Sequence, residues 1–486
     1  MTPLNRLMEP VEVGPCTLRN RIVSSANYSA MAEDHFFGER ISLYHTEKAK
    51  GGVALTITEE LSVHPSSDFG QARNVKAYDE RAVRGFKLFS SMVHAHGALT
   101  VGQLWHGGVN VTNRDPWNLG INIPLSVSPM ASPMFPDGTT VPKEMTLEDI
   151  REIQKGYVIS ARNLISGGFD GVEIHATHGY LPNQFLSPLY NRRTDEYGGS
   201  KQNRMRFLSE LVELLDGETG NKKILGVSIV GDEHFPGGLV LEDTIPVIQE
   251  LDATGKVDYF SVTAGGFALK SNLNNPPMYF DYSLFREIFP VVKKVLKHAK
   301  LFAIGRIVDP VLAEEILSRG EADAVVMMRA QIADPHLANK IHQGRLGDII
   351  PCVGCNQACF GHVTMWANPI SCILNPTVGR EKEWGEGSLK PAIVPKRIAV
   401  IGGGPAGCEA AIIASRRGHQ VTLFEGKNSI GGQVLLAATL PGRSDFGLAI
   451  HYWERQLEKL NVSVVLNHDV SVNEISGGEY NFVIVA

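Results

Sequence analysis

Several features that mark specialised protein classes are absent from this chain of 486 residues. No apolar run reaches the ~20 residues that a membrane-spanning helix needs. The opening Met-Thr-Pro-Leu-Asn-Arg is not followed by the apolar stretch of a signal peptide. A formal net charge of only -6 gives no electrostatic reason to expect binding to nucleic acid. The sequence therefore predicts a globular cytoplasmic protein whose partners are neither membranes nor nucleic acids.

Cysteine is also scarce, with six residues in the chain, but four of them lie close together. Their spacing, C-x2-C-x3-C-x12-C, suits thiolates that surround a single inorganic centre. Three bunched ligands and one distant ligand favour an iron–sulfur cluster, because structural zinc sites usually combine two short pairs. Zinc, and a disulfide or free thiols, are the alternatives that spacing leaves open. The four are Cys352, Cys355, Cys359 and Cys372.

The first 345 residues alternate short apolar runs with longer amphipathic stretches. Eight such runs, each followed by a helical pattern, predict a closed (β/α)8 barrel in an α/β protein. An open, doubly wound sheet is the alternative, which the number of units disfavours. The predicted strands are Arg21–Ala26, Val53–Thr58, Ala98–Leu104, Gly171–His175, Ile224–Val230, Asp258–Thr263, Leu301–Gly305 and Ala324–Met328.

A second nucleotide-binding pattern follows the cysteines. An apolar strand from Arg397 runs into a glycine-rich turn, and a second strand ends at Glu425 about twenty residues later. Strand, turn, helix and terminal acid together predict a Rossmann-like dinucleotide fold. The chain ends on a further strand-like run, so we expect it to hold only the first part of that domain. The predicted units are 1–345 (barrel), 346–380 (cluster segment), 381–395 (linker) and 396–486 (dinucleotide domain).

Barrel active sites lie at the carboxyl ends of the strands, where the fourth run carries His175, His178 and Tyr180. Neutral imidazole N–H groups can hold a developing oxyanion, and a phenol can deliver a proton. The competing interpretation is that one histidine fills the barrel and the tyrosine packs on the next helix.

Three other strand ends suggest contacts with a heterocycle and a phosphate. Gln103 ends the third run, where an amide can hydrogen-bond a heterocycle or satisfy its own loop. Gly305-Arg306 and Met328-Arg329 end the last two runs, where barrels often bind phosphate. Arginine binds phosphate through two parallel hydrogen bonds, although surface ion pairing is the alternative role.

Four motifs now resemble a known family: Asn20-Arg-Ile-Val, Gln103-Leu-Trp-His-Gly-Gly, Phe169-Asp-Gly-Val-Glu-Ile-His and Asn191-Arg-Arg-Thr-Asp-Glu-Tyr-Gly-Gly-Ser. They look like old yellow enzyme barrels. With the cysteines and the glycine-rich turn, the whole chain resembles the iron–sulfur branch, which includes bacterial 2,4-dienoyl-CoA reductase and trimethylamine dehydrogenase. The resemblance implies FMN in the barrel, a [4Fe–4S] cluster on the four cysteines, and FAD and NAD(P)H at the C-terminal domain.

The resemblance also assigns roles to individual residues. Tyr180 matches the proton donor, and His175 and His178 match the pair that polarises a substrate carbonyl. The matched FMN contacts are Ser25, Ala26, Gln103, Gly305, Arg306, Met328 and Arg329. The matched FAD contacts are Gly402, Gly404, Gly407, Glu425 and Gln433.

This sequence departs from the family pattern at three places. Ser228 stands where the fifth strand usually carries an arginine beside flavin N1. Met328 replaces the glycine of a Gly-Arg phosphate loop. The segment between Val262 and Tyr282 lacks the catalytic histidine of the dienoyl-CoA reductase branch, which argues against a dienoyl-CoA substrate.

The sequence thus predicts an NAD(P)H-dependent oxidoreductase that reduces an activated C=C bond of a small molecule. The alternative is an amine dehydrogenase or N-demethylase that passes electrons through the cluster to an electron-transfer flavoprotein. A third interpretation, prompted by Ser228, is a cluster-bearing electron-transfer or sensor protein without FMN. The choice between NADH and NADPH, and whether the protein forms a homo-oligomer, stay open.

Overall fold

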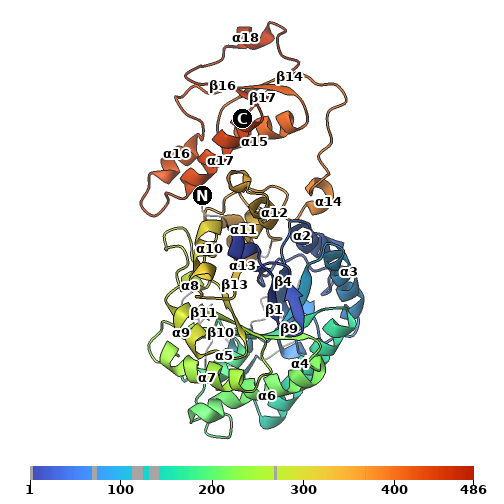
Figure 1. Ribbon diagram of the computed structural model, residues 1–486, viewed down its shortest axis with the longest axis vertical. Helices are drawn as coiled ribbons and strands as arrows, with labels where there is room; N and C mark the ends of the chain where they lie inside the picture. Colours follow the sequence, from blue (N-terminus) through green and yellow to red (C-terminus); the bar gives the residue numbers. More distant parts are fainter. Residues whose placement is uncertain (1–3, 68–73, 112–123, 131–141, 267–270, 367) are drawn as a thin grey trace.

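The computed structural model describes residues 4–67, 74–111, 124–130, 142–266, 271–366 and 368–486. Figure 1 shows a large barrel domain and a smaller C-terminal domain at one end of it. Much of the segment between Gly107 and Pro142 falls outside the described residues.

Eight parallel strands form the closed barrel predicted from the sequence. Their order around the ring is β3-β13-β12-β11-β10-β9-β6-β4, and pairing of β3 with β4 closes it. Closure rules out the open doubly wound sheet. The strands are β3 (Ile22–Ser24), β4 (Leu55–Ser62), β6 (Leu99–Trp105), β9 (Gly171–Ala176), β10 (Ile224–Asp232), β11 (Tyr259–Ala264), β12 (Lys300–Ala303) and β13 (Ala324–Val326).

Helices surround this ring (Figure 1), and some of them begin at side-chain caps. Thr146 and Asp149 form a reciprocal capping box, and the Asp309 side chain accepts from the Val311 N–H. The main barrel helices are α2 (Glu39–Lys50), α3 (Ala82–His94), α4 (Leu147–Ser166), α6 (Lys201–Thr219), α7 (Leu241–Ala253), α9 (Ile288–Val295), α10 (Pro310–Ser318), α11 (Met328–Ala333) and α12 (Leu337–His342).

Short elements complete the barrel domain at its two ends. An antiparallel pair joins β1 to β2 near the N-terminus, and a short parallel pair joins β7 to β8. These elements are α1 (Asn5–Met8), β1 (Val11–Val13), β2 (Cys16–Leu18), β5 (Val75–Lys76), β7 (Leu125–Ser126), β8 (Lys143–Glu144), α5 (Leu181–Leu186) and α8 (Ser271–Asn274).

The C-terminal domain is a parallel sheet in the order β16-β15-β14-β17 with helices packed on it. It has its own buried core, to which Ile412, Leu423 and Trp453 belong. The elements are β14 (Arg397–Ile401), α15 (Pro405–Arg416), β15 (Gln420–Phe424), α16 (Gln433–Ala438), α17 (Phe446–Lys459), β16 (Ser463–Val465), α18 (Val472–Ser476) and β17 (Phe482–Val485).

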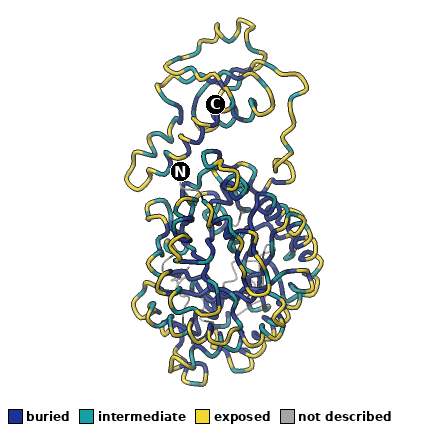
Figure 2. Tube along the Cα trace, in the orientation of Figure 1, coloured by how far each residue is buried: buried dark blue, intermediate teal, exposed yellow. Residues whose placement is uncertain are grey.

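The cysteine segment lies between the two cores. It contains the π-helical turn η4 (Gln357–Gly361), α13 (His362–Trp366) and α14 (Glu381–Trp384). Cys359 and Cys372 pack against the barrel core, whereas Cys355 packs against the core of the C-terminal domain. Figure 2 shows dark, buried chain through the barrel and more exposed chain around the C-terminal sheet.

Among the described helices, none combines the length and the apolar character that crossing a membrane requires.

The glycine-rich turn of the C-terminal domain depends on close backbone packing at Gly407. A Cβ atom at Gly407 would lie 1.9 Å from the Gly402 carbonyl oxygen, which cannot move away without breaking the turn. We therefore expect Gly407→Ala to destabilise this domain by about 1–3 kcal/mol. Urea unfolding, followed by hydrogen exchange in α15 and β14, measures the effect.

Gly447→Ala is the matched control, since its Cβ would meet nothing within 4 Å and α17 already holds it in helical conformation. Alanine there should leave stability unchanged or raise it by about 0.4–1 kcal/mol. Equal loss of stability in both variants would contradict the packing argument.

Candidate functional site

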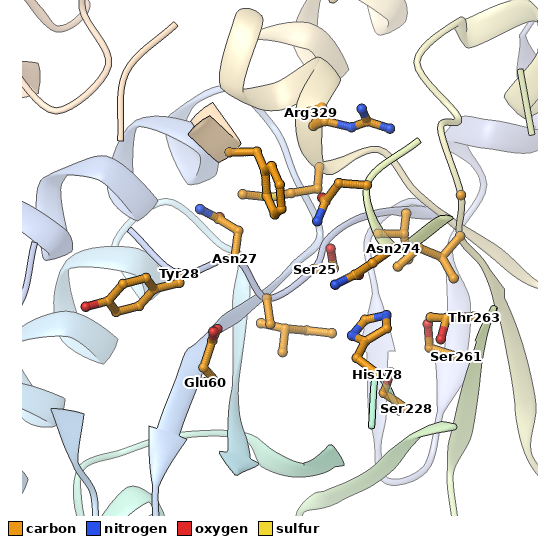
Figure 3. Close-up of a pocket in the computed structure, with 18 of the residues that line it drawn as sticks. Ser25, Asn27, Tyr28, Glu60, His178, Ser228, Ser261, Thr263, Asn274 and Arg329 are labelled. Atoms are coloured by element: carbon orange, nitrogen blue, oxygen red, sulfur yellow. The ribbon is translucent and has the colours of Figure 1, made fainter. Parts of the chain in front are cut away.

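A single cavity opens where the barrel strands end at their carboxyl edge. Strands β4, β6, β9, β10 and β11 each contribute lining side chains, and so does the segment after β12. Figure 3 shows His178, Ser228, Ser261 and Thr263 on one side of this cavity, Glu60 on the other, and Arg329 above them. This is the face of a barrel on which active sites are built.

The three predicted catalytic residues meet in this cavity. The His175 ring centroid lies 5.3 Å from that of His178 and 5.0 Å from that of Tyr180. His178 adopts a left-handed backbone conformation, with φ of 60°, which a bridge to Gly266 holds in place. Tyr180 also packs edge-on against Trp105. Both histidines and Tyr180 line the cavity.

Burial fixes the charge of these three side chains. It lowers the pKa of His178 to about 3 and holds the pKa of His175 well below its usual range, with the neighbouring His178 adding to the effect on His175. Burial is the main cause that raises the pKa of Tyr180, and the nearby carboxyl group of Glu60 adds a smaller increase. Near neutral pH the imidazoles are thus uncharged donors and the phenol keeps its proton. The Nδ1 atom of His175 is buried without a partner, as expected of a group that awaits a ligand.

Gln103 lines the cavity beside a buried carboxyl group. Its Nε2 donates to Glu173 Oε1 at 2.6 Å, and the Tyr259 hydroxyl donates to Glu173 Oε2 at 2.8 Å. Desolvation raises the pKa of Glu173 to about 7. The Gln103 amide is therefore held in one orientation, which suits the predicted contact with a flavin pyrimidine.

A register irregularity in β4 brings an acid into the cavity. The pairing of β4 with β6 shifts between Ile57 and Glu60, so both of these residues line the pocket although they are three apart. Glu59 instead accepts hydrogen bonds from the backbone N–H and the hydroxyl of Ser29. Burial raises the pKa of Glu60 to about 7. A carboxyl group that faces the substrate cavity was not among the residues predicted from the sequence.

Ser228 lies in the wall where the family pattern has an arginine. It is in register with His175 on β9 and with Ser261 on β11. All three line the cavity, together with Thr263. Hydroxyl groups therefore occupy this part of the wall, and the lining cations, Arg306 and Arg329, belong to the segments after β12 and β13.

The end of the cavity near β12 has the features of a phosphate site. Gly305 and Arg306 have φ values of 122° and 52°, and the backbone N–H of Ser283 donates to the Arg306 carbonyl oxygen. The Arg306 side chain is 2% exposed, and its Nε is buried without a partner. A guanidinium donor left unsatisfied in a pocket fits the phosphate group of FMN.

The other predicted phosphate residues start α11. Met328 lines the cavity and accepts a hydrogen bond from the Ser24 hydroxyl through its sulfur atom. The Arg329 side chain donates to the Pro276 carbonyl oxygen at 2.7 Å and to Asn356 Oδ1 at 2.9 Å. One guanidinium nitrogen of Arg329 thus bridges the segment after β11 and the cysteine segment. The predicted residues Ser25 and Ala26 line the same cavity, directly after β3.

The four predicted cysteine ligands surround one small cavity of their own. All four are among the described residues, and no three of their Sγ atoms lie mutually within 4.8 Å. Tetrahedral zinc with Zn–S bonds of ~2.3 Å would hold its sulfur atoms about 3.8 Å apart. A cubane binds each cysteine at a separate corner and keeps them farther apart. The wider spacing therefore fits a [4Fe–4S] cluster.

The surroundings of these thiols are apolar. Burial raises the pKa of Cys359 and of Cys372 to about 12, and that of Cys355 above its usual range, while Arg329 opposes the rise at Cys355 and Cys359. Thiolates at these positions need the positive charge of bound iron.

The cysteine cavity and the barrel cavity share part of a wall. Arg329, Ile332 and Cys359 line both of them. A cluster ligand therefore borders the predicted flavin site directly. This contact supports electron transfer between the two sites.

The glycine-rich turn of the C-terminal domain has the predicted form. Gly404 is the N-cap residue of α15 and provides no side-chain cap. A Cβ atom added at Gly404 would meet nothing within 4 Å, so the N-terminus of the helix is open to a pyrophosphate. Glu425 accepts from the Gly403 and Lys427 N–H groups. The loop before Gln433 packs on the turn, where the Gly431 N–H donates to the Gly403 carbonyl oxygen at 2.7 Å. These contacts fit a dinucleotide flavin.

Sequence reasoning missed two acids of the barrel site. The Glu59-Glu60 pair at the end of an apolar run was a usable signal for a charged strand end. Glu173 lies inside the predicted strand Gly171–His175. An acidic side chain inside a barrel strand needs a buried hydrogen-bond partner, and this requirement was the usable signal.

Comparison with known proteins agrees with this geometry. Residues 6–348 match the NADH:flavin oxidoreductase / NADH oxidase family, and residues 396–485 match the pyridine nucleotide-disulphide oxidoreductases. NADH oxidase of Thermoanaerobacter brockii is 34% identical over 100% of this chain and 73% of its own length. N,N-dimethylglycine/sarcosine dehydrogenase of Chromohalobacter salexigens is 36% identical over 95% of this chain and 66% of its own length.

A solved structure of 2-naphthoyl-CoA reductase with 2-naphthoyl-CoA superposes with a TM-score of 0.93 at 29% identity, over 99% of this chain and 74% of that one. The chain is an oxidoreductase whose cofactors are FMN, a [4Fe–4S] cluster, FAD and NAD(P)H. It belongs to the NADH:flavin oxidoreductase / NADH oxidase family.

Proposed function

We propose that the protein catalyses the NAD(P)H-dependent reduction of an activated C=C bond, such as that of an enone or enoate. The observation that carries this proposal is the pair of neutral imidazoles of His175 and His178 in the cavity wall, beside the protonated phenol of Tyr180. Two uncharged N–H donors and a proton source are what conjugate reduction of an unsaturated carbonyl compound requires.

Each unit of the chain has its part in the proposal. We assign FMN to residues 1–345, the cluster to 346–380, a linker to 381–395 and the dinucleotide flavin to 396–486. When bound, FMN supplies hydride transfer, and the cluster and FAD supply electrons that originate from the nicotinamide. The shared wall at Arg329, Ile332 and Cys359 supports this order of carriers.

The side chains of the barrel then act on the substrate. His175 and His178 donate to the carbonyl oxygen and stabilise the negative charge that develops there. Tyr180 gives its proton to the α-carbon, and its pKa, raised by burial, keeps the proton in place until that carbon becomes basic. Gln103, fixed by Glu173, orients the flavin ring.

Glu60 favours a second candidate, oxidation of an amine. A carboxylate in the cavity wall can pair with a substrate ammonium group. In this mode substrate electrons leave through the cluster to an electron-transfer flavoprotein. The similarity to a dimethylglycine/sarcosine dehydrogenase supports this candidate, and that to a naphthoyl-CoA reductase supports the first. Either activity fits a cytoplasmic location, because thiolate ligands need a reducing compartment.

Anaerobic stopped-flow mixing with NADH, NADPH, enones and methylated amines in turn tests the direction of electron flow. Bleaching of the flavins by a nicotinamide, followed by recovery of flavin absorbance with an enone, supports reduction. Bleaching by an amine alone replaces the first candidate with the second.

Tyr180→Phe removes the proposed proton donor and keeps the ring packed on Trp105. We expect the kcat of enone reduction to fall about 10²- to 10⁴-fold, because proton transfer by a positioned acid contributes that much. The rate of flavin reduction by the nicotinamide should not change. Tyr190→Phe is the control, since Tyr190 is buried nearby but does not line the cavity. An unchanged kcat in Tyr180→Phe would remove this residue from the mechanism.

Ser228→Arg restores a fixed positive charge in the wall beside His175 and Ser261. We expect a more positive FMN midpoint potential and tighter FMN binding, because a cation stabilises the added electrons. Spectroscopic redox titration measures the potential, with Ser228→Met as the control that adds bulk but no charge. If Ser228→Arg has the same FMN midpoint potential as the wild type, the absence of a cation at position 228 does not determine that potential.

Glu60→Gln separates the two candidate substrates. In the wild type the Glu60 carboxyl group has a pKa of about 7, so the fraction of Glu60 that is ionised increases as the pH rises through 7. The affinity for an ammonium substrate should therefore increase over the same pH interval. The glutamine variant should bind amines more weakly and with a flat pH profile between 6 and 8, measured as KM or Kd. Enone affinity should change little. Amine binding that keeps the wild-type pH profile in Glu60→Gln would show that another group recognises the cation.

A further inference from the structure

Asp445 of the C-terminal domain reaches the phosphate end of the barrel cavity. It stands at the N-terminus of α17 and forms an ion pair with Arg306, whose guanidinium donates to Asp445 Oδ2. The Tyr282 hydroxyl donates to the same carboxylate oxygen at 2.9 Å. Arg306 and Asp445 are 139 residues apart in the chain and belong to different domains. One carboxylate oxygen therefore joins the two domains at the edge of the predicted flavin site.

This link is held in a single geometry. The Arg306 guanidinium lies over the Tyr282 ring at 4.5 Å from its centroid, and the backbone of Arg306 has the left-handed φ of 52°. The Arg306 side chain is 2% exposed and that of Asp445 is 15% exposed. Solvent thus screens the pair weakly, and removal of either partner would leave a buried charge.

The guanidinium has donors left over after it binds Asp445. Its Nη2 serves the carboxylate, while Nε is buried and unpartnered. A planar guanidinium can serve two anions through different N–H groups at the same time. The ion pair with Asp445 fixes the orientation of the guanidinium plane. It thereby also fixes the directions in which the remaining N–H groups of Arg306 can donate.

We propose that Asp445 is a positioning residue that couples occupancy of the FMN phosphate position to docking of the C-terminal domain on the barrel. This inference rests on the proposed placement of FMN beside Arg306. A phosphate at Arg306 and the carboxylate of Asp445 share one cation, so each holds the guanidinium in the orientation that the other needs. Coupling between two sites is reciprocal: docking tightens FMN binding, and FMN tightens docking.

A second ion pair made by the same helix offers a matched control. Lys459, also on α17, pairs with Asp348, which lies at the start of the cluster segment. Neither residue lines the barrel cavity. Lys459→Met should therefore weaken docking without changing the response to FMN.

The experiment measures FMN binding and docking independently of catalysis. Quenching of FMN fluorescence gives the FMN affinity of flavin-depleted protein. Thermolysin cleavage in the linker, where Ile393 is fully exposed, reports how firmly the C-terminal domain is docked. Asp445→Asn keeps the shape of the side chain and removes its charge. Tyr282→Phe removes one hydrogen bond and serves as the milder variant if the first folds poorly.

We expect FMN to slow linker cleavage in the wild type. In Asp445→Asn, FMN affinity should fall about 5- to 10-fold, at the low end of typical coupling between sites, and FMN should no longer protect the linker. Tyr282→Phe should show the same changes to a smaller extent. Lys459→Met should cleave faster than the wild type with or without FMN, and should keep the full FMN-dependent protection.

Arg306→Gln distinguishes failure of this inference from failure of the FMN placement. If Arg306→Gln leaves FMN affinity unchanged, FMN does not use Arg306 and the placement is wrong. If Arg306→Gln weakens FMN binding but Asp445→Asn retains both wild-type affinity and FMN-dependent protection, the placement stands and the coupling is overturned.

Discussion

The low dielectric of the barrel mouth is the constraint on which the chemistry of this protein depends. Eight parallel strands close on themselves, and their carboxyl ends bring polar side chains together around one cavity. Desolvation keeps His175 and His178 uncharged and keeps the proton on Tyr180. It also raises the pKa of Glu60 to about 7. The same histidines on an exposed loop would titrate near their ordinary pKa and would lose their constant role as donors.

Much of the fold followed from patterns that are local in sequence. All eight barrel strands lie where the apolar runs predicted them. The cysteine spacing located the cluster segment, although spacing alone left zinc as an alternative. The resemblance to a family, rather than periodicity, supplied the roles of His175 and Tyr180.

Features that depend on long-range geometry were out of reach of the sequence. Strict alternation along β4 would place Ile57 and Glu59 on one face, whereas the register irregularity brings Glu60 to the cavity. The contact between Arg306 and Asp445 joins two domains and leaves no local trace in the sequence. Arg329 was predicted from its position after a strand, but its guanidinium turns toward Pro276 and Asn356 of the neighbouring loops.

The position of the cysteines between two cores has a consequence for assembly. Cys359 and Cys372 pack on the barrel, Cys355 packs on the C-terminal core, and all three line one cavity. Iron bound there joins two folded bodies as well as carrying electrons, since metal binding free energy becomes folding free energy. Loss of the cluster would therefore weaken the packing of the C-terminal domain on the barrel as well as interrupt the path for electrons.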